Sequence, residues 1–251
     1  MSARDLKVRY ATSFLGYLWS VLDPLVMSLI YWFVFTQVFH RDVGEDPYIV
    51  FLISALLPWV WFNSSVSDFT KAFKRDSRLV RSTNIPRSIW VNRIVLSKGM
   101  EFLFSLPVLA LFVIVNAMVE TDPEKVVQVG WGILWFPVAV LLQVILLVGL
   151  GMLVAPLCAL YADLERTTGL ILRALFYATP IIYSVSNLPG PFEIIGSFNP
   201  LAGIFTLYRM AFFPDQWHLT TVLISVVMTL AIFVLGSWVF RSLERPVLKE
   251  L

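Results

Sequence analysis

Long apolar runs dominate the sequence and determine its structural class. There are six such runs: Val21–Phe39, Tyr48–Val66, Gly99–Val119, Trp131–Leu160, Gly169–Tyr183 and Leu219–Phe240. A helix needs about 20 apolar residues to cross a hydrocarbon core of about 30 Å. Only 14% of the residues are charged, whereas soluble domains are about a quarter charged. The sequence therefore predicts an all-α integral membrane protein with six transmembrane helices in one domain, residues 1–251.

The basic residues are distributed unevenly between the predicted loops. If the amino terminus is cytoplasmic, 16 of the 19 Lys and Arg residues lie inside, and only Arg41, Lys125 and Arg209 lie outside. Cytoplasmic loops of membrane proteins carry an excess of Lys and Arg. The pattern predicts a multi-pass protein with both termini in the cytoplasm. The single Cys158 excludes a disulfide within the chain.

Residues 1–15 have the pattern of an amphipathic helix. Leu6, Tyr10 and Phe14 recur at helical spacing, and the basic side chains lie off that face. Such a helix lies flat on the inner leaflet. It either orients the chain or takes part in gating, and its predicted interfacial residues are Arg4, Lys7, Arg9, Tyr10 and Trp19.

The stretch 186–217 is mostly apolar but is broken by Pro189, Pro191, Pro200 and Pro214. Its longest uninterrupted piece, of about thirteen residues, is too short to cross the bilayer. We expect a pair of re-entrant or interfacial helices on the outer side.

The cytoplasmic region 71–98 carries eight basic residues: Lys71, Lys74, Arg75, Arg78, Arg81, Arg87, Arg93 and Lys98. One interpretation is an anchor on anionic lipid, to which each charge contributes about 1 kcal/mol. The other is a docking helix for a cytoplasmic partner, because Leu79, Val80 and Ile85 interrupt the charges. Pro86 suits the first turn of the helix that follows.

Polar and aromatic side chains within the predicted spans are candidates for function. A polar group inside a membrane is costly unless it faces a cavity or a partner, which draws attention to Asp23, Glu101 and Gln143. Asp23 and Glu101 lie near cytoplasmic ends, where snorkelling, or a bond with Lys98 or with a neighbouring span, accounts for them. Aromatic residues at span ends are more often interfacial anchors than ligand contacts. The candidates for a channel or substrate path are Tyr31, Trp32, Trp59 and Gln143.

Four segments resemble, in the same order, permease subunits of bacterial ABC exporters for O-antigen, teichoic acid and other lipid-linked polysaccharides. The most specific is the amino-terminal signature, RDLKVRYATSFLGYLWSVLDPLVMSLIYWFVFTQVF. The family's coupling segment is similar to LVRSTNIPRSIWV, and the end of its fifth span to YADLERTTGLILRALFYATPIIYSVSNLP. Its outer gate region is similar to FNPLAGIFTLYRMAFF.

The resemblance implies an inner-membrane subunit that pairs with a second copy of itself, binds two ATPase subunits and moves a lipid-linked glycan between the two halves. The residues implied in ATPase coupling are Arg78, Leu79, Val80, Arg81, Ile85, Pro86 and Arg87, and those implied in the outer gate are Glu193, Pro200 and Arg209. The partner ATPase would bind ATP and Mg. The chain has no Gly-rich loop ending in Gly-Lys-Ser/Thr, so we do not expect it to hydrolyse ATP. Membrane lipid is a further expected partner, and nucleic acid is not.

Two other functions are compatible with the topology. A permease of a drug or small-lipid ABC exporter would share it, but would not usually share the amino-terminal signature. An integral-membrane enzyme of lipid-linked glycan metabolism would need paired acids, a His cluster or a cationic phosphate site. His40 and His218 stand alone in predicted outer loops, so we expect neither catalytic residues nor a metal site.

Overall fold

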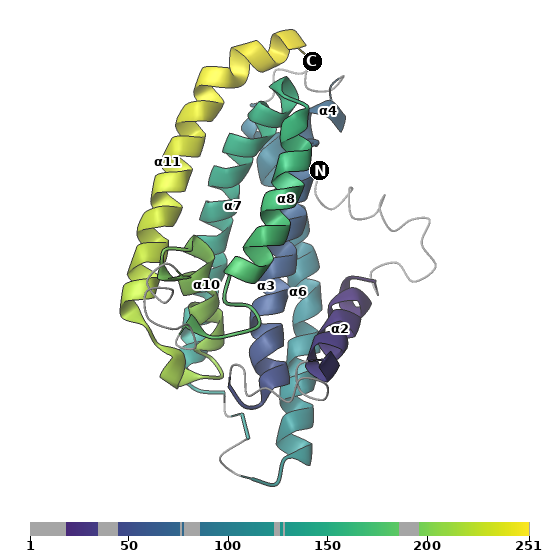
Figure 1. Ribbon diagram of the computed structural model, residues 1–251, viewed down its shortest axis with the longest axis vertical. Coiled ribbons are helices and arrows are strands. Elements are labelled where there is room, and N and C mark those ends of the chain that lie inside the picture. Colours follow the sequence, from purple (N-terminus) through teal and green to yellow (C-terminus); the bar gives the residue numbers. More distant parts are fainter. Residues whose placement is uncertain are drawn as a thin grey trace.

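The computed structural model describes residues 19–34, 45–75, 77, 86–122, 126–127, 129–185 and 196–250. Within these residues the chain is a bundle of helices with no β-strand (Figure 1), which confirms the predicted all-α class. The predicted interfacial helix, residues 1–15, lies outside the described residues. So do Arg4, Lys7, Arg9, Tyr10, Arg78, Leu79, Val80, Arg81, Ile85 and Glu193.

Four of the six predicted runs form helices that are long and apolar enough to cross a membrane. They are α3 (Tyr48–Phe69), α6 (Ser88–Val119), the stretch of η3 (Trp131–Leu134) with α7 (Trp135–Leu160), and α11 (Leu219–Glu250) as far as Val247. The other two predicted runs correspond to α2 (Trp19–Trp32) and α8 (Asp163–Ala178). Within the described residues, both of these helices are shorter than a full span.

Helix α3 forms the centre of the bundle. About 78% of its most apolar stretch is buried against other helices, compared with 22% for α6 and for α11. Figure 1 shows α3 behind α8, with α2 and α6 beside it. The outer helices therefore present most of their apolar surface away from the chain, and α3 supplies much of the core.

Helix α6 begins earlier than the apolar run predicts. The run begins at Gly99, but the helix begins at Ser88, where the Ile89 amide donates to the Pro86 carbonyl at 3.0 Å. Pro86 therefore lies just before the helix rather than in its first turn. The additional turns contain Arg93 and Lys98, because a charged side chain ends an apolar run without ending a helix.

The fourth apolar run contains glycines at which helices α7 and α11 pack closely. Helix α7 is continuous past Gly149, Gly151 and Pro156. A Cβ atom on Gly149 would lie 2.6 Å from the Phe233 Cα of α11, and a Cβ on Gly236 would collide with the Gly149 carbonyl. These glycines allow the backbones of α7 and α11 to approach closely, as small residues do between membrane helices.

The segment predicted to lie on the outer side contains a short buried helix, α10 (Pro200–Arg209), followed by η5 (Pro214–Gln216). Asn199 caps α10 by accepting a hydrogen bond from the Leu201 amide, and Pro200 occupies the first turn, as is favourable at a helix start. With ten residues, α10 is only about 15 Å long, half the thickness of the hydrocarbon core. Its re-entry into a bilayer stays a prediction.

Candidate functional site

An open groove of about 370 Å³ lies between α2, α3 and α8. Apolar side chains from all three helices line it, together with Tyr31, Trp59, Asn63, Arg173, Phe176 and Tyr177. Tyr31 and Trp59, two of the predicted path residues, therefore lie at one site although they come from different helices. The volume lies in the range of ligand pockets, and the lining combines aromatic surface with a few polar groups.

The aromatic rings of the groove contact one another around Phe176. The Phe176 ring stacks on Tyr31 at a centroid distance of 5.9 Å, and meets the edge of Trp59 at 5.5 Å and Tyr177 at 5.1 Å. Tyr177 is 71% exposed. Part of this aromatic surface is therefore free to stack against a flat, partly apolar ligand.

Helix α8 supplies half of the aromatic residues and has the character of a helix that borders water. Asp163 and Glu165 lie in its first turn, where acidic side chains interact favourably with the helix dipole. Arg173 is exposed and donates from Nε to the Gly169 carbonyl at 3.2 Å. Of its residues only Leu172 is buried, so most of α8 is left uncovered by the described part of the chain.

Arg209 of α10 holds the segment that follows α8. Its guanidinium donates to the Ile181 carbonyl at 2.7 Å and to the Tyr183 carbonyl at 3.5 Å, and lies 3.6 Å from the centre of the Phe51 ring. The side chain is buried. The Asn199 side chain also donates to Thr179 Oγ1 at 2.8 Å. These bonds join α10 to the end of α8 and to α3.

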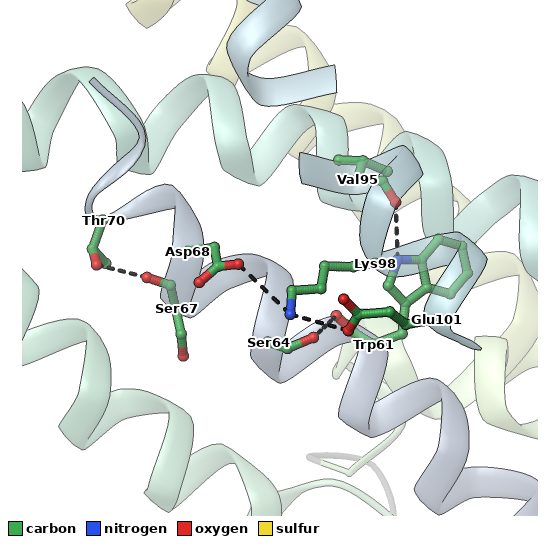
Figure 2. A network of polar contacts seen from close by, with 8 residues as sticks. All are labelled: Trp61, Ser64, Ser67, Asp68, Thr70, Val95, Lys98 and Glu101. Atoms are coloured by element: carbon green, nitrogen blue, oxygen red, sulfur yellow. Dashed lines mark hydrogen bonds and ion pairs between the residues drawn. The ribbon is translucent and has the colours of Figure 1, made fainter. Parts of the chain in front are cut away.

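The buried Lys98 of α6 bridges two carboxylates (Figure 2). Its ammonium lies 3.1 Å from Glu101 on α6 and 3.7 Å from Asp68 at the end of α3. The predicted bond between Glu101 and Lys98 is thus confirmed. Figure 1 places this end of α3 at the same end of the bundle as α4 (Ala72–Arg75) and the carboxyl terminus of α11.

The remaining predicted residues occupy separate places. Arg87 pairs with Glu244 of α11 at 3.4 Å, and Pro86 is exposed beside it. Gln143 is fully buried; it donates to the Pro58 carbonyl at 2.8 Å and accepts from the Tyr208 hydroxyl at 2.9 Å. It therefore joins α7 to α3 and α10, away from the groove. Trp32 is half-buried at the end of α2 and is not among the groove residues, and Trp19 begins that helix.

The model of one protein family matches most of the chain. That family is described as ABC-2 type transporter, and the match covers residues 1–213. The chain belongs to the ABC-2 type transporter family. Membership confirms the broad family to which the four sequence segments pointed.

Several curated ABC-2 relatives are similar to the chain over nearly its whole length. The O-antigen export system permease protein RfbA of Klebsiella pneumoniae is 34% identical over 241 residues, 96% of this chain and 89% of that protein. RfbA of Myxococcus xanthus is 28% identical over 215 residues, 85% of this chain and 78% of that protein. The polysialic acid transport protein KpsM of Escherichia coli is 22% identical over 246 residues, 98% of this chain and 92% of that protein.

Among the polar and aromatic groove residues of this ABC-2 transporter, four were not found from the sequence: Asn63, Arg173, Phe176 and Tyr177. For the last three, the signal within the apolar run Gly169–Tyr183 is Arg173 together with two adjacent aromatic residues, Phe176 and Tyr177. A basic residue one turn before exposed aromatic residues indicates a helix face that borders water rather than lipid.

Proposed function

We propose that the chain is the transmembrane subunit of an exporter that moves a lipid-linked polysaccharide across the bacterial inner membrane. A separate ATPase supplies the energy, and the chain itself performs no chemistry. The observation that carries this proposal is the aromatic groove between α2, α3 and α8, found in a chain whose relatives include O-antigen export permeases. Sugar rings have apolar faces that stack on aromatic side chains, and their hydroxyls bond to groups such as Asn63 and Arg173.

The proposed assembly contains two copies of the chain and two ATPase subunits. Helices α2 and α8 supply the first and fifth crossings, which gives six crossings with both termini in the cytoplasm. Two features support this arrangement. Helix α8 has 16 residues, of which one is buried, so a second copy can cover its exposed side. At about 1.5 Å per residue it is about 24 Å long, and the chain from Thr179 to Val185 can complete the crossing.

Movement of the ATPase is transmitted through the basic segment, residues 70–87, which connects α3 to α6. Leu79, Val80 and Ile85 form the buried contact, and Arg78, Arg81 and Arg87 form its charged rim, with Pro86 fixing the start of α6. Central apolar side chains carry most of the energy of an interface, whereas rim charges chiefly adjust rate and orientation. At the outer side, Glu193, Pro200 and Arg209 belong to the gate. The amino-terminal helix, residues 1–15, lies on the inner leaflet.

The test is to remove exposed aromatic rings inside and outside the groove. Tyr177→Ala removes a ring that is 71% exposed in the groove, and Trp238→Ala removes one that is 68% exposed on α11. The measurement is the amount of polysaccharide that reaches the cell surface in a strain carrying each variant, with protein levels determined in parallel. We expect Tyr177→Ala to lower export by about tenfold, which corresponds to one stacking contact of about 1.4 kcal/mol.

The matched variant Trp238→Ala is expected to export normally. Equal export by both variants would refute the role of the groove. Loss of drug resistance with normal surface polysaccharide on deletion of the gene would refute the polysaccharide as substrate and support a drug exporter.

A further inference from the structure

Lys98 is one of two charged side chains that are buried within the described part of the chain; the other is Arg209. Lys98 is 7% exposed and lies in an apolar helix. Burying an ammonium group is unfavourable unless it is paired and hydrogen-bonded. The contacts of Lys98 therefore define its role.

The contacts of Lys98 connect the two helices on either side of the basic segment. Asp68 lies one residue before α3 ends at Phe69, and Lys98 lies in the first third of α6, whose start follows the segment. The distance from the ammonium to the Asp68 carboxylate is 3.7 Å. The bridge therefore joins the end of α3 to α6 ten residues after Ser88, where that helix begins. Glu101 at 3.1 Å fixes the ammonium from its own helix.

Trp61 of α3 makes a second set of contacts between the same two helices. The Trp61 indole donates to the Val95 carbonyl at 3.3 Å and stacks on Phe102 at a centroid distance of 5.1 Å. A Cβ atom on Gly99 would lie 3.1 Å from the Trp61 ring. Figure 2 shows Trp61, Val95, Lys98 and Glu101 side by side along this contact. A single tryptophan thus occupies the surface of α6 from Val95 to Phe102.

We propose that Lys98 is a positioning residue that makes α3 and α6 move as one rigid lever under the basic segment. This inference rests on the proposed function, because it concerns how movement of the ATPase reaches the spans. Without the bridge, the end of α3 beyond Trp61 moves separately from α6, and displacement of the segment between the two helices is absorbed there. ATP is then hydrolysed without equivalent export, since coupling requires an element with two discrete arrangements that both sites bias.

The test compares Lys98→Met with a variant that also removes the two acids. Lys98→Met keeps an unbranched side chain but removes the ammonium that contacts Asp68 and Glu101. The triple variant Lys98→Met, Asp68→Asn, Glu101→Gln removes all three charges, and with them any cost that loss of the ammonium imposes on the carboxylates. Lys98→Arg keeps the charge, and Lys249→Met, at an exposed position near the end of α11, is the matched control for loss of a lysine.

Two quantities are measured on the complex with its ATPase: polysaccharide exported per ATP hydrolysed, and the distance between spin labels at position 67 of α3 and position 96 of α6. Both positions are exposed, and the labels are introduced with Cys158 replaced by Ala. We expect Lys98→Met and the triple variant to lower export per ATP by about tenfold, in the range of typical coupling between sites. The distance distribution should broaden in both, and Lys98→Arg and Lys249→Met should resemble the wild type.

A merely structural role predicts a different pattern. The triple variant would then regain both thermal stability and export per ATP, and that result overturns the proposal. An unchanged distance distribution in Lys98→Met also overturns it. If the Lys98→Met chain does not assemble with the ATPase, the triple variant is compared with the wild type, and that comparison alone supports or overturns the proposal. The distance measurement needs no substrate. Failure of the wild-type complex to export polysaccharide would therefore refute the proposed function while the labels still test the lever.

Discussion

Two faces of α3 are built differently, although the residues that mark them, Trp59 and Trp61, are only two positions apart in the sequence. Trp61 faces α6, where it is bonded to Val95 and stacked on Phe102. Trp59 faces α2 and α8, where it contacts Phe176 and lines an open groove. One face of the helix is fixed to its neighbour, and the other borders space for a ligand. In the proposed mechanism, α3 transmits movement through the face that carries Trp61, and the face that carries Trp59 accommodates the transported molecule.

The largest expected effect comes from truncating the ring on the packed face. Trp61→Ala removes the contacts with Val95, Gly99 and Phe102 and should lower the free energy of unfolding by about 3–5 kcal/mol. Tyr177→Ala, in the groove, should change it by less than about 0.5 kcal/mol. The measurement is thermal unfolding of the purified protein in detergent. Similar melting temperatures for the two variants would contradict the distinction between the faces.

A second prediction compares two arginines. Arg209 is buried over the Phe51 ring, whereas Arg173 is exposed and lines the groove. Arg209→Met leaves the carbonyls of Ile181 and Tyr183 without their donor. Each buried carbonyl without a partner costs about 1–3 kcal/mol. Arg173→Met removes an exposed charge in the groove and should cost less than about 0.5 kcal/mol. Unfolding in detergent checks both values. Should Arg173→Met prove the more destabilising, the groove would be part of the packed core rather than a ligand surface.

The outcome at these sites shows what the sequence could reveal. Run length and the scarcity of charge predicted α3, α6, the η3–α7 stretch and α11. The thickness of the hydrocarbon core sets the length of a span, and its low polarity makes charged residues costly. The bond between Lys98 and Glu101 was predictable, since residues three apart on a helix are neighbours. The role of Gln143 was not predictable. A buried amide can face a channel or bond to other helices, and the sequence does not show that Pro58 and Tyr208 lie beside it.

The groove was predictable only in part for the same reason. Tyr31 and Trp59 stood out as aromatic residues within spans, but Phe176 and Tyr177 were assigned to an apolar crossing. The run Gly169–Tyr183 hid the exposed face of α8, which is visible only when Arg173 is placed on the helix. Pairing of Lys98 with Asp68 depends on how α3 and α6 pack, which is a tertiary property absent from the local pattern.

A third prediction uses two glycines to sharpen the comparison. A Cβ on Gly99 would lie 3.1 Å from the Trp61 ring, whereas a Cβ on Gly169 of α8 would have no atom within 4 Å. Gly99→Val overpacks the contact between α3 and α6 and should cost about 1–3 kcal/mol. Gly169→Val should change stability by less than about 0.5 kcal/mol. Melting curves of the two variants provide the check. A neutral Gly99→Val would mean that α3 and α6 can separate easily, which would also weaken the rigid-lever proposal.

The smallest effect is expected at the ion pair between Lys71, which follows the end of α3, and Glu165 in the first turn of α8. Lys71 lies 3.2 Å from Glu165, and their side chains are 63% and 39% exposed. Exposed pairs contribute about 0–1 kcal/mol and are screened by salt. Lys71→Gln should therefore shift the melting temperature by no more than about 2 °C and leave export per ATP unchanged. The same assay should detect the loss caused by Lys98→Met. If Lys71→Gln instead lowered export as strongly as Lys98→Met, force would reach the groove directly through α8. The packed face of α3 would then not be the route of transmission.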